Sequence, residues 1–140
     1  MEHTHPLIER IVAAVLRRTL QATLLPTFRP DRPIAEQRRR LQRFTRLTLR
    51  PRGVRFEPEL CGGVPGEFVR SRAAPDTASP AILYLHGGAY CVGSPVTHRS
   101  ISGALARLTG ATVFVADYRL APEHPCPAAL DDAIAAYLGL

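Results

Sequence analysis

Apolar residues recur at helical spacing in the first third of the chain. Between Leu7 and Leu25 they fall at i, i+3, i+4, i+7 and i+8, which predicts an amphipathic helix. Prolines at positions 26, 30 and 33 then indicate a short linker. A thinner apolar stripe predicts a second helix over Ile34–Leu49, whose other face carries arginines. The apolar positions of the first helix are Ile8, Ile11, Val12, Val15 and Leu16.

The pattern changes to short extended runs after the second helix. Val54–Leu60 and Glu67–Arg70 are predicted to be extended, and residues 62–66 between them hold three glycines and a proline. Glycine and proline between two short alternating runs are typical of an antiparallel pair of strands. The small and polar stretch Ala73–Pro80 is predicted to be a surface loop.

Two continuous apolar runs in the second half predict buried strands, at Ala81–Leu85 and Thr112–Ala116. A helix from about Thr97 to Leu108 lies between them, and Gly110 ends it. This spacing predicts a βαβ unit with parallel strands and a right-handed crossover. The expected buried stripe of this helix is Ile101, Ala104, Leu105 and Leu108.

A last helix is predicted to begin near Pro127. The fold class expected from these elements is α/β. The apolar face of the last helix is Leu130, Ile134, Tyr137 and Leu138.

The composition is that of a folded protein with an uneven charge. The 140 residues are 46% hydrophobic and 21% charged, which excludes wholesale disorder, collagen and coiled coil. All 18 basic residues are Arg, and the formal net charge is +6. Residues 1–72 hold 15 Arg and 7 acidic residues, whereas residues 73–140 hold 3 Arg and 5 acidic residues. The basic half raises nucleic acid or an anionic membrane as possible partners.

The arginine face around residues 38–50 lacks the interleaved aromatic side chains that bind single strands. We interpret it as the solvated or lipid-edge face of a helix, and no nucleic-acid partner is expected. No apolar run approaches the ~18 residues of a membrane span, so no transmembrane segment is expected either. The oligomeric state stays open.

No cofactor or metal site is expected. Asp117, Asp131 and Asp132 come nearest to an acidic cluster, but adjacent residues on a helix point in different directions. The three cysteines, at positions 61, 91 and 126, lie far apart and form no zinc-binding spacing. We interpret them as reduced thiols, which favours a cytoplasmic protein.

A candidate site follows directly after the first predicted parallel strand, where residues 86–90 read H-G-G-A-Y. Adjacent glycines let the backbone turn tightly and approach a ligand. Ligands of open α/β sheets bind at this end of the strands. Backbone N–H groups here could donate to a developing oxyanion, although an ordinary Gly-Gly turn explains the pattern equally well. A phosphate-binding loop fits less well, because the chain has no G-x-G-x-x-G and no lysine.

The same residues resemble a known family. H-G-G-A-Y resembles the H-G-G-G loop of lipases and esterases with the α/β-hydrolase fold. Residues 117–125 read D-Y-R-L-A-P-E-H-P and residues 127–133 read P-A-A-L-D-D-A. Together they resemble the D-Y-R-L-A-P-E-H-P-x-P-A-A-x-x-D-A signature of the hormone-sensitive-lipase-like family, mostly bacterial carboxylesterases. The resemblance covers residues 54–138, and residues 62–69 resemble a strand turn of its short-chain esterase, lactone-hydrolase and acetyl-hydrolase members.

The resemblance implies the amino-terminal half of an α/β-hydrolase domain over residues 54–140, a partial fold with an open, mostly parallel sheet flanked by helices. It also implies a helical cap segment over residues 1–50. The implied activity is hydrolysis of a small-molecule carboxylic ester, namely a short-chain ester, a lactone or an acetyl ester. The backbone N–H groups of Gly88 and Ala89 would be the oxyanion donors, with Gly87 shaping the loop. Ala89 stands where a third glycine is usual, and its N–H can still donate if Ala tolerates the local φ.

The resemblance also implies structural roles for residues around this loop. His86 would orient the loop rather than act as a base. Arg119 and Glu123 would hold the loop after the second strand as an ion pair, and Asp117 and Tyr118 belong to the same structural motif.

The serine nucleophile of such an enzyme is missing from the 140 residues. It lies in G-x-S-x-G and is followed in the chain by an acid and a histidine. None of the five serines of the chain has glycine at both −2 and +2. They are Ser71, Ser79, Ser94, Ser100 and Ser102. We therefore expect the nucleophile, acid and base beyond Leu140 and expect this chain alone to be inactive. The alternative is a non-catalytic basic interaction domain or an inactive gene relic.

Overall fold

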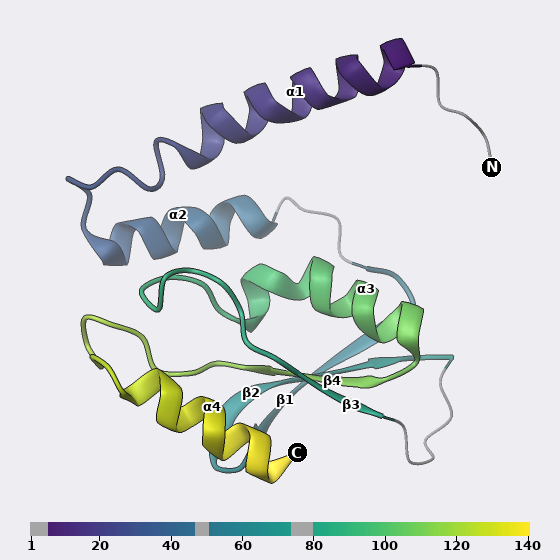
Figure 1. Cartoon of the computed structure of the whole chain (residues 1–140), viewed down its shortest axis with the longest axis vertical. Helices are drawn as coiled ribbons and strands as arrows, with labels where there is room; N and C mark the ends of the chain where they lie inside the picture. The colour runs from purple at the N-terminus through teal and green to yellow at the C-terminus, as the bar shows by residue number, and fades with distance from the viewer. Residues whose placement is uncertain (1–5, 47–50, 74–79) are drawn as a thin grey trace.

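The computed structural model describes residues 6–46, 51–73 and 80–140, which form a four-stranded sheet with helices on both faces (Figure 1). α3 (Arg99–Thr109) lies on one face and α4 (Ala128–Gly139) on the other, while α1 (Pro6–Leu24) and α2 (Ile34–Arg46) stand further out on the side of α3 (Figure 1). This confirms the predicted α/β fold class. The expectation of a mostly parallel sheet is wrong for the described residues, where the sheet is mixed and only Ala81–Tyr84 and Thr112–Ala116 pair in parallel. In chain order the elements are α1 (Pro6–Leu24), α2 (Ile34–Arg46), β1 (Val54–Cys61), β2 (Val64–Ser71), β3 (Ala81–Tyr84), the 3-10 turn η1 (Pro95–His98), α3 (Arg99–Thr109), β4 (Thr112–Ala116) and α4 (Ala128–Gly139).

The antiparallel pair that the sequence predicts is a hairpin of β1 and β2, with Cys61 opposite Val64. Its turn is Gly62-Gly63, with φ of 59° and 80°. A two-residue hairpin turn of this kind requires positive φ at both positions, which glycine adopts without strain. β1 is an edge strand, which explains why it can contain Pro58, a residue without an N–H to donate to a second neighbour.

The parallel pair is also confirmed, because β3 and β4 run in the same direction with Ala81 opposite Thr112. The strand order is β1-β2-β4-β3, so β4 lies at the centre and is buried on both faces. β3 ends one residue earlier than predicted, at Tyr84. Within the described residues β3 pairs only with β4, which leaves its other edge open.

Side chains of β4 alternate between two hydrophobic clusters. Val113 and Val115 pack in the cluster that includes Ala106 of α3. Phe114 packs in the cluster that includes Ala136 of α4. A strand with helices on both faces needs apolar side chains at every position, which is why it reads as a continuous apolar run.

The buried side of α3 differs from the predicted stripe. Ser102 and Gly103 are buried, whereas Ile101 is 50% exposed and Leu108 is 76% exposed. Small residues are needed here because α3 lies close to Pro51: a Cβ at Gly103 would lie 2.6 Å from the Pro51 side chain. The prediction is wrong at Ile101 and Leu108 because it ranked positions by hydrophobicity, while close packing here favours small residues.

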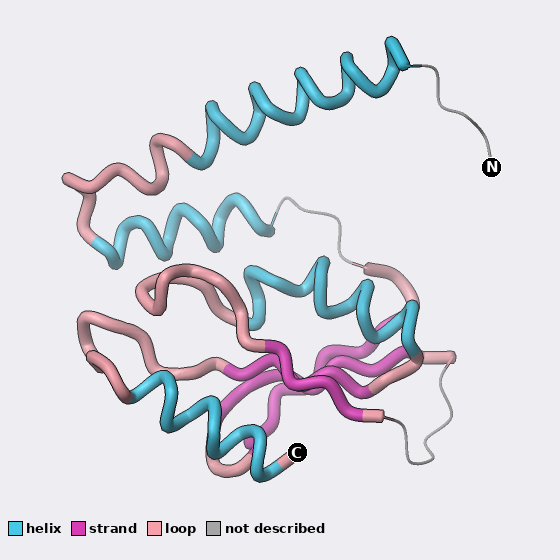
Figure 2. The backbone as a smooth tube through the Cα atoms, viewed as in Figure 1, coloured by secondary structure: helices cyan, strands magenta, loops and turns pink. Residues whose placement is uncertain are grey.

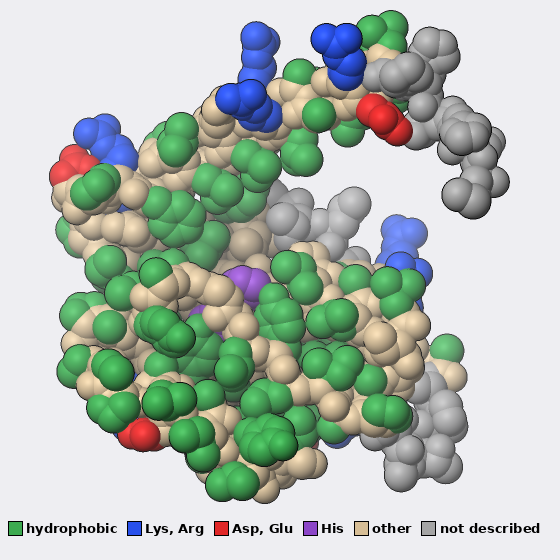
Figure 3. All heavy atoms as spheres, in the orientation of Figure 1, with side chains coloured by type: hydrophobic (Ala, Val, Ile, Leu, Met, Phe, Trp, Pro, Cys, Tyr) green, Lys and Arg blue, Asp and Glu red, His purple; other side chains and the backbone are tan. Residues whose placement is uncertain are grey.

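Large apolar side chains are exposed on two further helices. The predicted apolar face of α4, represented by Leu130 and Leu138, is half or more exposed, and α4 packs through Ala135 and Ala136 instead. The five apolar residues predicted for the first helix are each 55% or more exposed in α1. Figure 3 shows hydrophobic side chains gathered over much of the visible face. Large exposed apolar areas are typical of surfaces at which other groups bind.

Two predictions reach outside the described residues. The second helix is described as far as Arg46, short of its predicted end at Leu49, and positions 74–79 of the predicted loop Ala73–Pro80 lie outside as well. Throughout the described part of the chain, no helix combines the length and the apolar character that crossing a membrane requires.

The hairpin turn provides a matched pair of substitutions. Gly62→Ala and Gly63→Ala both place a Cβ at positive φ, a strain of about 1–2 kcal/mol. The Cβ at Gly62 would also lie 1.9 Å from the carbonyl oxygen of Ala135, whereas the Cβ at Gly63 meets nothing within 4 Å. We expect Gly62→Ala to lower the free energy of unfolding by at least about 2 kcal/mol more than Gly63→Ala. Pulse proteolysis in urea measures both, and equal losses would contradict the packing of the turn against α4.

Candidate functional site

Two loops lie side by side at the carboxyl ends of β3 and β4 (Figure 2). One covers residues 85–94 and the other residues 117–127. They are joined by a hydrogen bond in which the Ala121 N–H donates to the Tyr90 carbonyl oxygen at 2.8 Å. Because β3 and β4 are parallel neighbours, both loops emerge at the same edge of the sheet, where open α/β sheets bind ligands.

The carbonyl group of Gly88 is held from two sides. The N–H groups of Cys91 and Val92 both donate to the Gly88 oxygen, each at 3.0 Å. The peptide between Gly88 and Ala89 is planar and trans, so its N–H points away from its carbonyl oxygen. The N–H groups of Gly88 and Ala89 donate to no other described residue. Two backbone donors are therefore free at the end of β3.

Only glycine fits at position 88. Its φ is +137°, and a Cβ there would lie 1.9 Å from the carbonyl oxygen of Val92. Gly87 has no such restriction, because a Cβ at this position meets nothing within 4 Å. The two adjacent glycines thus differ: Gly88 is required by the geometry of the turn, and Gly87 is not.

Ala89 and Tyr90 both adopt the left-handed conformation, with φ of 51° and 58°. An L-residue in this region carries a strain of about 1–2 kcal/mol. Ala89 therefore keeps its N–H as a donor, as the sequence allowed, but in a strained conformation. Strained residues of this kind cluster at functional sites, where the surrounding contacts hold them.

His86 is buried beneath the loop. Its ring stacks on that of Tyr118, with centroids 4.4 Å apart, and its Nδ1 lies 3.1 Å from the Gly87 carbonyl oxygen. The Tyr118 hydroxyl donates to the His86 carbonyl oxygen at 2.5 Å. Burial lowers the pKa of His86, the hydrogen bond with Gly87 opposes this, and His98 adds to the lowering. His86 is therefore neutral at pH 7, and its buried Nε2 has no partner among the described residues.

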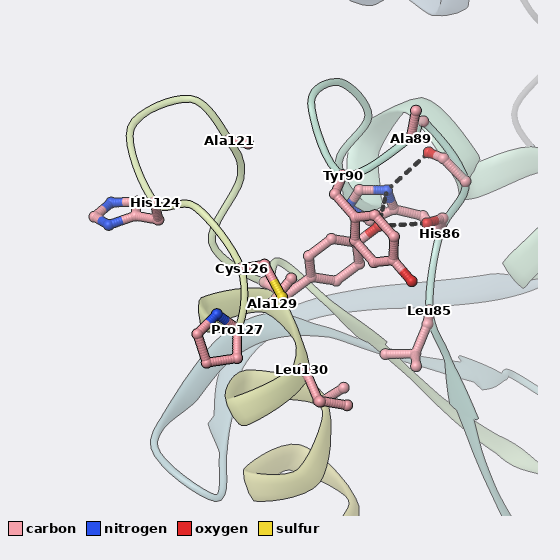
Figure 4. Close-up of a pocket in the computed structure, with 14 residues that line it drawn as sticks. Leu85, His86, Ala89, Tyr90, Ala121, His124, Cys126, Pro127, Ala129 and Leu130 are labelled. Atoms are coloured by element: carbon pink, nitrogen blue, oxygen red, sulfur yellow. Dashed lines mark hydrogen bonds between the residues drawn. The ribbon is translucent and has the colours of Figure 1, made fainter.

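A cavity of about 660 Å³ opens between the end of β3 and the start of α4. Leu85 and Leu130 point toward this space from opposite sides, and His124 points away from it (Figure 4). Most of the lining side chains are apolar, so the cavity suits an uncharged group. The lining residues are Leu85, His86, Gly87, Gly88, Ala89, Tyr90, Tyr118, Ala121, His124, Cys126, Pro127, Ala129, Leu130 and Ala133.

Comparison with known proteins identifies this arrangement. Residues 82–140 match a family model described as the alpha/beta hydrolase fold. An esterase of Acinetobacter venetianus is 35% identical over 132 residues, which cover 94% of this chain and 40% of that protein. The crystal structure of an esterase from the bacterial hormone-sensitive lipase family covers 99% of this chain and 43% of that one, with a TM-score of 0.74 and 32% identity. The chain belongs to the hormone-sensitive-lipase-like family of α/β-hydrolases.

A second relative matches a shorter segment more closely. An acetyl-hydrolase of Streptomyces hygroscopicus is 55% identical over 56 residues, which cover 40% of this chain and 19% of that protein. The chain spans less than half the length of each of these relatives. The family resemblance predicted from the H-G-G-A-Y and D-Y-R-L-A-P-E-H-P motifs is thus confirmed.

In this member of the hormone-sensitive-lipase-like family, Arg119 and Glu123 do not form the predicted ion pair. The Arg119 guanidinium donates to the Asp132 carboxylate of α4 at 2.8 and 3.0 Å, and the Arg119 N–H donates to the same carboxylate at 2.8 Å. Glu123 accepts from Arg38 of α2 instead. The ion pair that the family resemblance implied is therefore wrong, because the loop directs Arg119 toward α4 and Glu123 toward α2. Each side chain attaches the loop to a different helix.

Asp117 and Tyr118 lie where β4 passes into this loop. The Asp117 N–H donates to the Pro65 carbonyl oxygen at 2.8 Å, which continues the pairing with β2. Removal from water raises the pKa of the Asp117 carboxyl, and the charge of Glu67 adds to the effect. Burial likewise raises the pKa of Tyr118, whose hydroxyl stays protonated and can donate to His86.

Two polar contacts were missed at the level of sequence. The Arg99 guanidinium pairs with the buried carboxylate of Glu67, with Nε 3.0 Å from Oε2. A single carboxylate in an otherwise half-buried strand requires a partner, so Glu67 itself was a signal. The contacts of Arg38 had no such signal, because Arg38 is one of several arginines on the same helix. Among the described residues, no group of three or more His, Cys, Asp or Glu side chains is placed to hold a metal ion.

The Arg119–Asp132 contact can be tested against its neighbour. In the native state, the hydrogen bonds from Arg119 lower the pKa of the Asp132 carboxyl. Asp132→Asn removes this ion pair. Asp131→Asn removes the same charge one position away. We expect Asp132→Asn to lower Tm at pH 7 by roughly 3–6 °C and Asp131→Asn by less than about 2 °C, as measured by thermal unfolding. Equal decreases in Tm for the two variants would show that stability depends on the net charge of α4 and not on the contact between Arg119 and Asp132.

Stability should depend on pH through His86. In the unfolded chain the imidazole of His86 binds a proton near pH 6.5, whereas in the native state its pKa is lower. The contribution of the neutral His86 to the free energy of unfolding is therefore fully present above about pH 6.5. It is lost as the pH decreases toward the native pKa. The loss is at most about 1.4 kcal/mol per pH unit for one proton. His86→Phe should remove this part of the slope between pH 7 and pH 5 in urea unfolding curves. Parallel pH profiles of the two proteins would contradict the burial of a neutral His86.

Proposed function

We propose that this chain supplies the oxyanion hole of a serine carboxylic-ester hydrolase. The observation that carries the proposal is the pair of free N–H groups at Gly88 and Ala89, held in place by the hydrogen bonds to the Gly88 carbonyl oxygen. Donors fixed before the reaction stabilise negative charge without having to reorganise, which is worth about 3–4 kcal/mol per donor. Family membership supports the same chemistry.

The proposed reaction follows from these donors. A serine Oγ attacks the ester carbonyl carbon and loses its proton to a histidine, while the carbonyl oxygen becomes an oxyanion that accepts hydrogen bonds from Gly88 and Ala89. The intermediate then expels the alcohol, which takes the proton from the histidine, and leaves an acyl-enzyme that water hydrolyses. His86 is buried beneath the loop and its Nδ1 contacts the Gly87 carbonyl oxygen, so we assign it to shaping the loop and not to proton transfer.

The nucleophile, acid and base come from residues outside these 140 in this proposal, because the chain has no G-x-S-x-G. The open edge of β3 and the exposed apolar face of α4 support further protein at this side of the sheet. By the same reasoning, the 140 residues alone are inactive. We further propose that residues 1–50 belong to a cap over the site.

The proposed substrate is a small uncharged ester, such as a short-chain ester, a lactone or an acetyl ester. The apolar lining of the cavity favours an uncharged acyl or alcohol group. The names of the relatives, an esterase and an acetyl-hydrolase, point to the same class. The cysteines at positions 61, 91 and 126 are free thiols, which favours the cytoplasm as the compartment.

A chimera tests the proposal. Residues 1–140 are joined to the part of the Acinetobacter venetianus esterase that follows the matched region, and hydrolysis of p-nitrophenyl acetate is measured. We expect activity that a serine-directed inhibitor abolishes, and none from the 140 residues alone. Gly88→Ala should lower kcat/KM at least about 10²-fold, because the added Cβ collides with Val92 and displaces the donors.

The control is Gly63→Ala, the same chemical change in a distant turn with open space, which should change kcat/KM less than about threefold. A folded but inactive chimera, or an active one indifferent to Gly88→Ala, would refute the assignment of the oxyanion hole. Inhibitor-resistant turnover by the 140 residues alone would refute the serine mechanism.

A further inference from the structure

Arg38 is the described residue that connects α2 to both loops of the site. Its Nε donates to the Cys91 carbonyl oxygen at 2.7 Å, and its Nη2 donates to the Ala121 carbonyl oxygen at 2.8 Å. Nη1 and Nη2 also donate to the two carboxylate oxygens of Glu123, at 2.9 and 2.8 Å. One guanidinium therefore holds three groups from two loops: the carbonyls of Cys91 and Ala121 and the carboxylate of Glu123.

The geometry of these contacts requires a guanidinium. Arginine presents five N–H donors in a rigid plane, and the bidentate contact with Glu123 fixes the direction of that plane. Nε then remains for Cys91, and one further proton of Nη2 remains for Ala121. A lysine ammonium is a compact charge that could satisfy the carboxylate but could not reach the same separate acceptors at once. The side chain is 24% exposed, so water competes little for these bonds.

A short series of bonds leads from Arg38 to the oxyanion donors. Arg38 holds the carbonyl of Cys91, and the N–H of Cys91 donates to the carbonyl oxygen of Gly88. The Gly88 carbonyl belongs to the same planar peptide as the N–H of Ala89, so its direction fixes the direction of that donor. On the other side, Arg38 holds Ala121, whose N–H donates to Tyr90. The strained residues Ala89 and Tyr90 thus lie between two segments that Arg38 holds.

We propose that Arg38 is a positioning residue, which keeps the N–H of Ala89 directed at the oxyanion by holding the carbonyls of Cys91 and Ala121. This inference rests on the proposed function for its catalytic consequence. Arg38 acts through the backbone of the two loops and touches no reacting atom. It also couples α2, within the proposed cap, to the geometry of the oxyanion hole.

The first test measures loop protection in the whole 140-residue chain and needs no catalysis. Arg38→Lys keeps the charge and loses the planar contacts, and Arg39→Lys is the matched control on the exposed side of α2. Hydrogen exchange followed by NMR should show at least about tenfold faster exchange at the amides of Cys91, Val92 and Ala121 in Arg38→Lys only. Amides of the β1–β2 hairpin should keep their rates, since local opening leaves the sheet folded.

The second test measures kinetics in the active chimera described above. Arg38→Lys should lower kcat at least about tenfold and change KM less than about threefold, because a misdirected donor weakens an interaction made only in the transition state. Arg39→Lys should leave both constants within twofold. A general loss of folding would instead reduce the active fraction and be visible as faster exchange throughout the sheet.

The two tests separate the possible failures. Unchanged exchange at Cys91, Val92 and Ala121, or uniform acceleration across the sheet, would overturn the positioning role of Arg38. Equal kinetics of Arg38→Lys and Arg39→Lys in an active chimera would overturn it as well. Local acceleration in Arg38→Lys together with a folded but inactive chimera would support the loop contact and overturn the proposed function.

Discussion

The geometry of the site depends on how the carbonyl group of Gly88 is held. Two N–H groups, from Cys91 and Val92, donate to its oxygen, and the rest of the loop is arranged to allow this. The φ of +137° at Gly88, the absence of a side chain there and the left-handed conformations of Ala89 and Tyr90 all follow from bringing Val92 back toward Gly88. Because a peptide is rigid and planar, holding its oxygen also directs its N–H.

Elements whose burial is set by local pattern could be predicted from the sequence. Two apolar runs separated by a helix predicted parallel strands, since a central strand covered on both faces needs apolar residues at every position. The glycine pair predicted the hairpin turn, because its φ values are available mainly to glycine. The stripe of α3 could not be predicted, because the buried Gly103 lies against Pro51, a contact between distant parts of the chain that no local pattern contains.

Around the candidate site, too, some features could be predicted from the sequence and others could not. The tight turn at the glycine pair was readable, but the family resemblance assigned the shaping of the loop to Gly87, whereas the structure requires glycine at position 88. The partners of the charged residues were not readable. Arg38 and Glu123 lie 85 positions apart, and nothing local distinguishes Arg38 from the other arginines of α2. Partner choice among charges depends on which side chains the folded chain brings within about 4 Å, and local sequence patterns do not contain that information.

Alanine at position 89 has a physical consequence where a third glycine is usual in the family. Glycine would adopt φ of 51° without strain but would also leave the loop many other conformations. Alanine has fewer alternatives, so less conformational entropy is lost when the loop is ordered. Its strain of about 1–2 kcal/mol must be balanced by contacts on both sides, here the bonds at Gly88 and those of Arg38 to Cys91 and Ala121. A loop of this composition therefore depends on its neighbours more than an all-glycine loop would, which makes the contact with α2 part of the site.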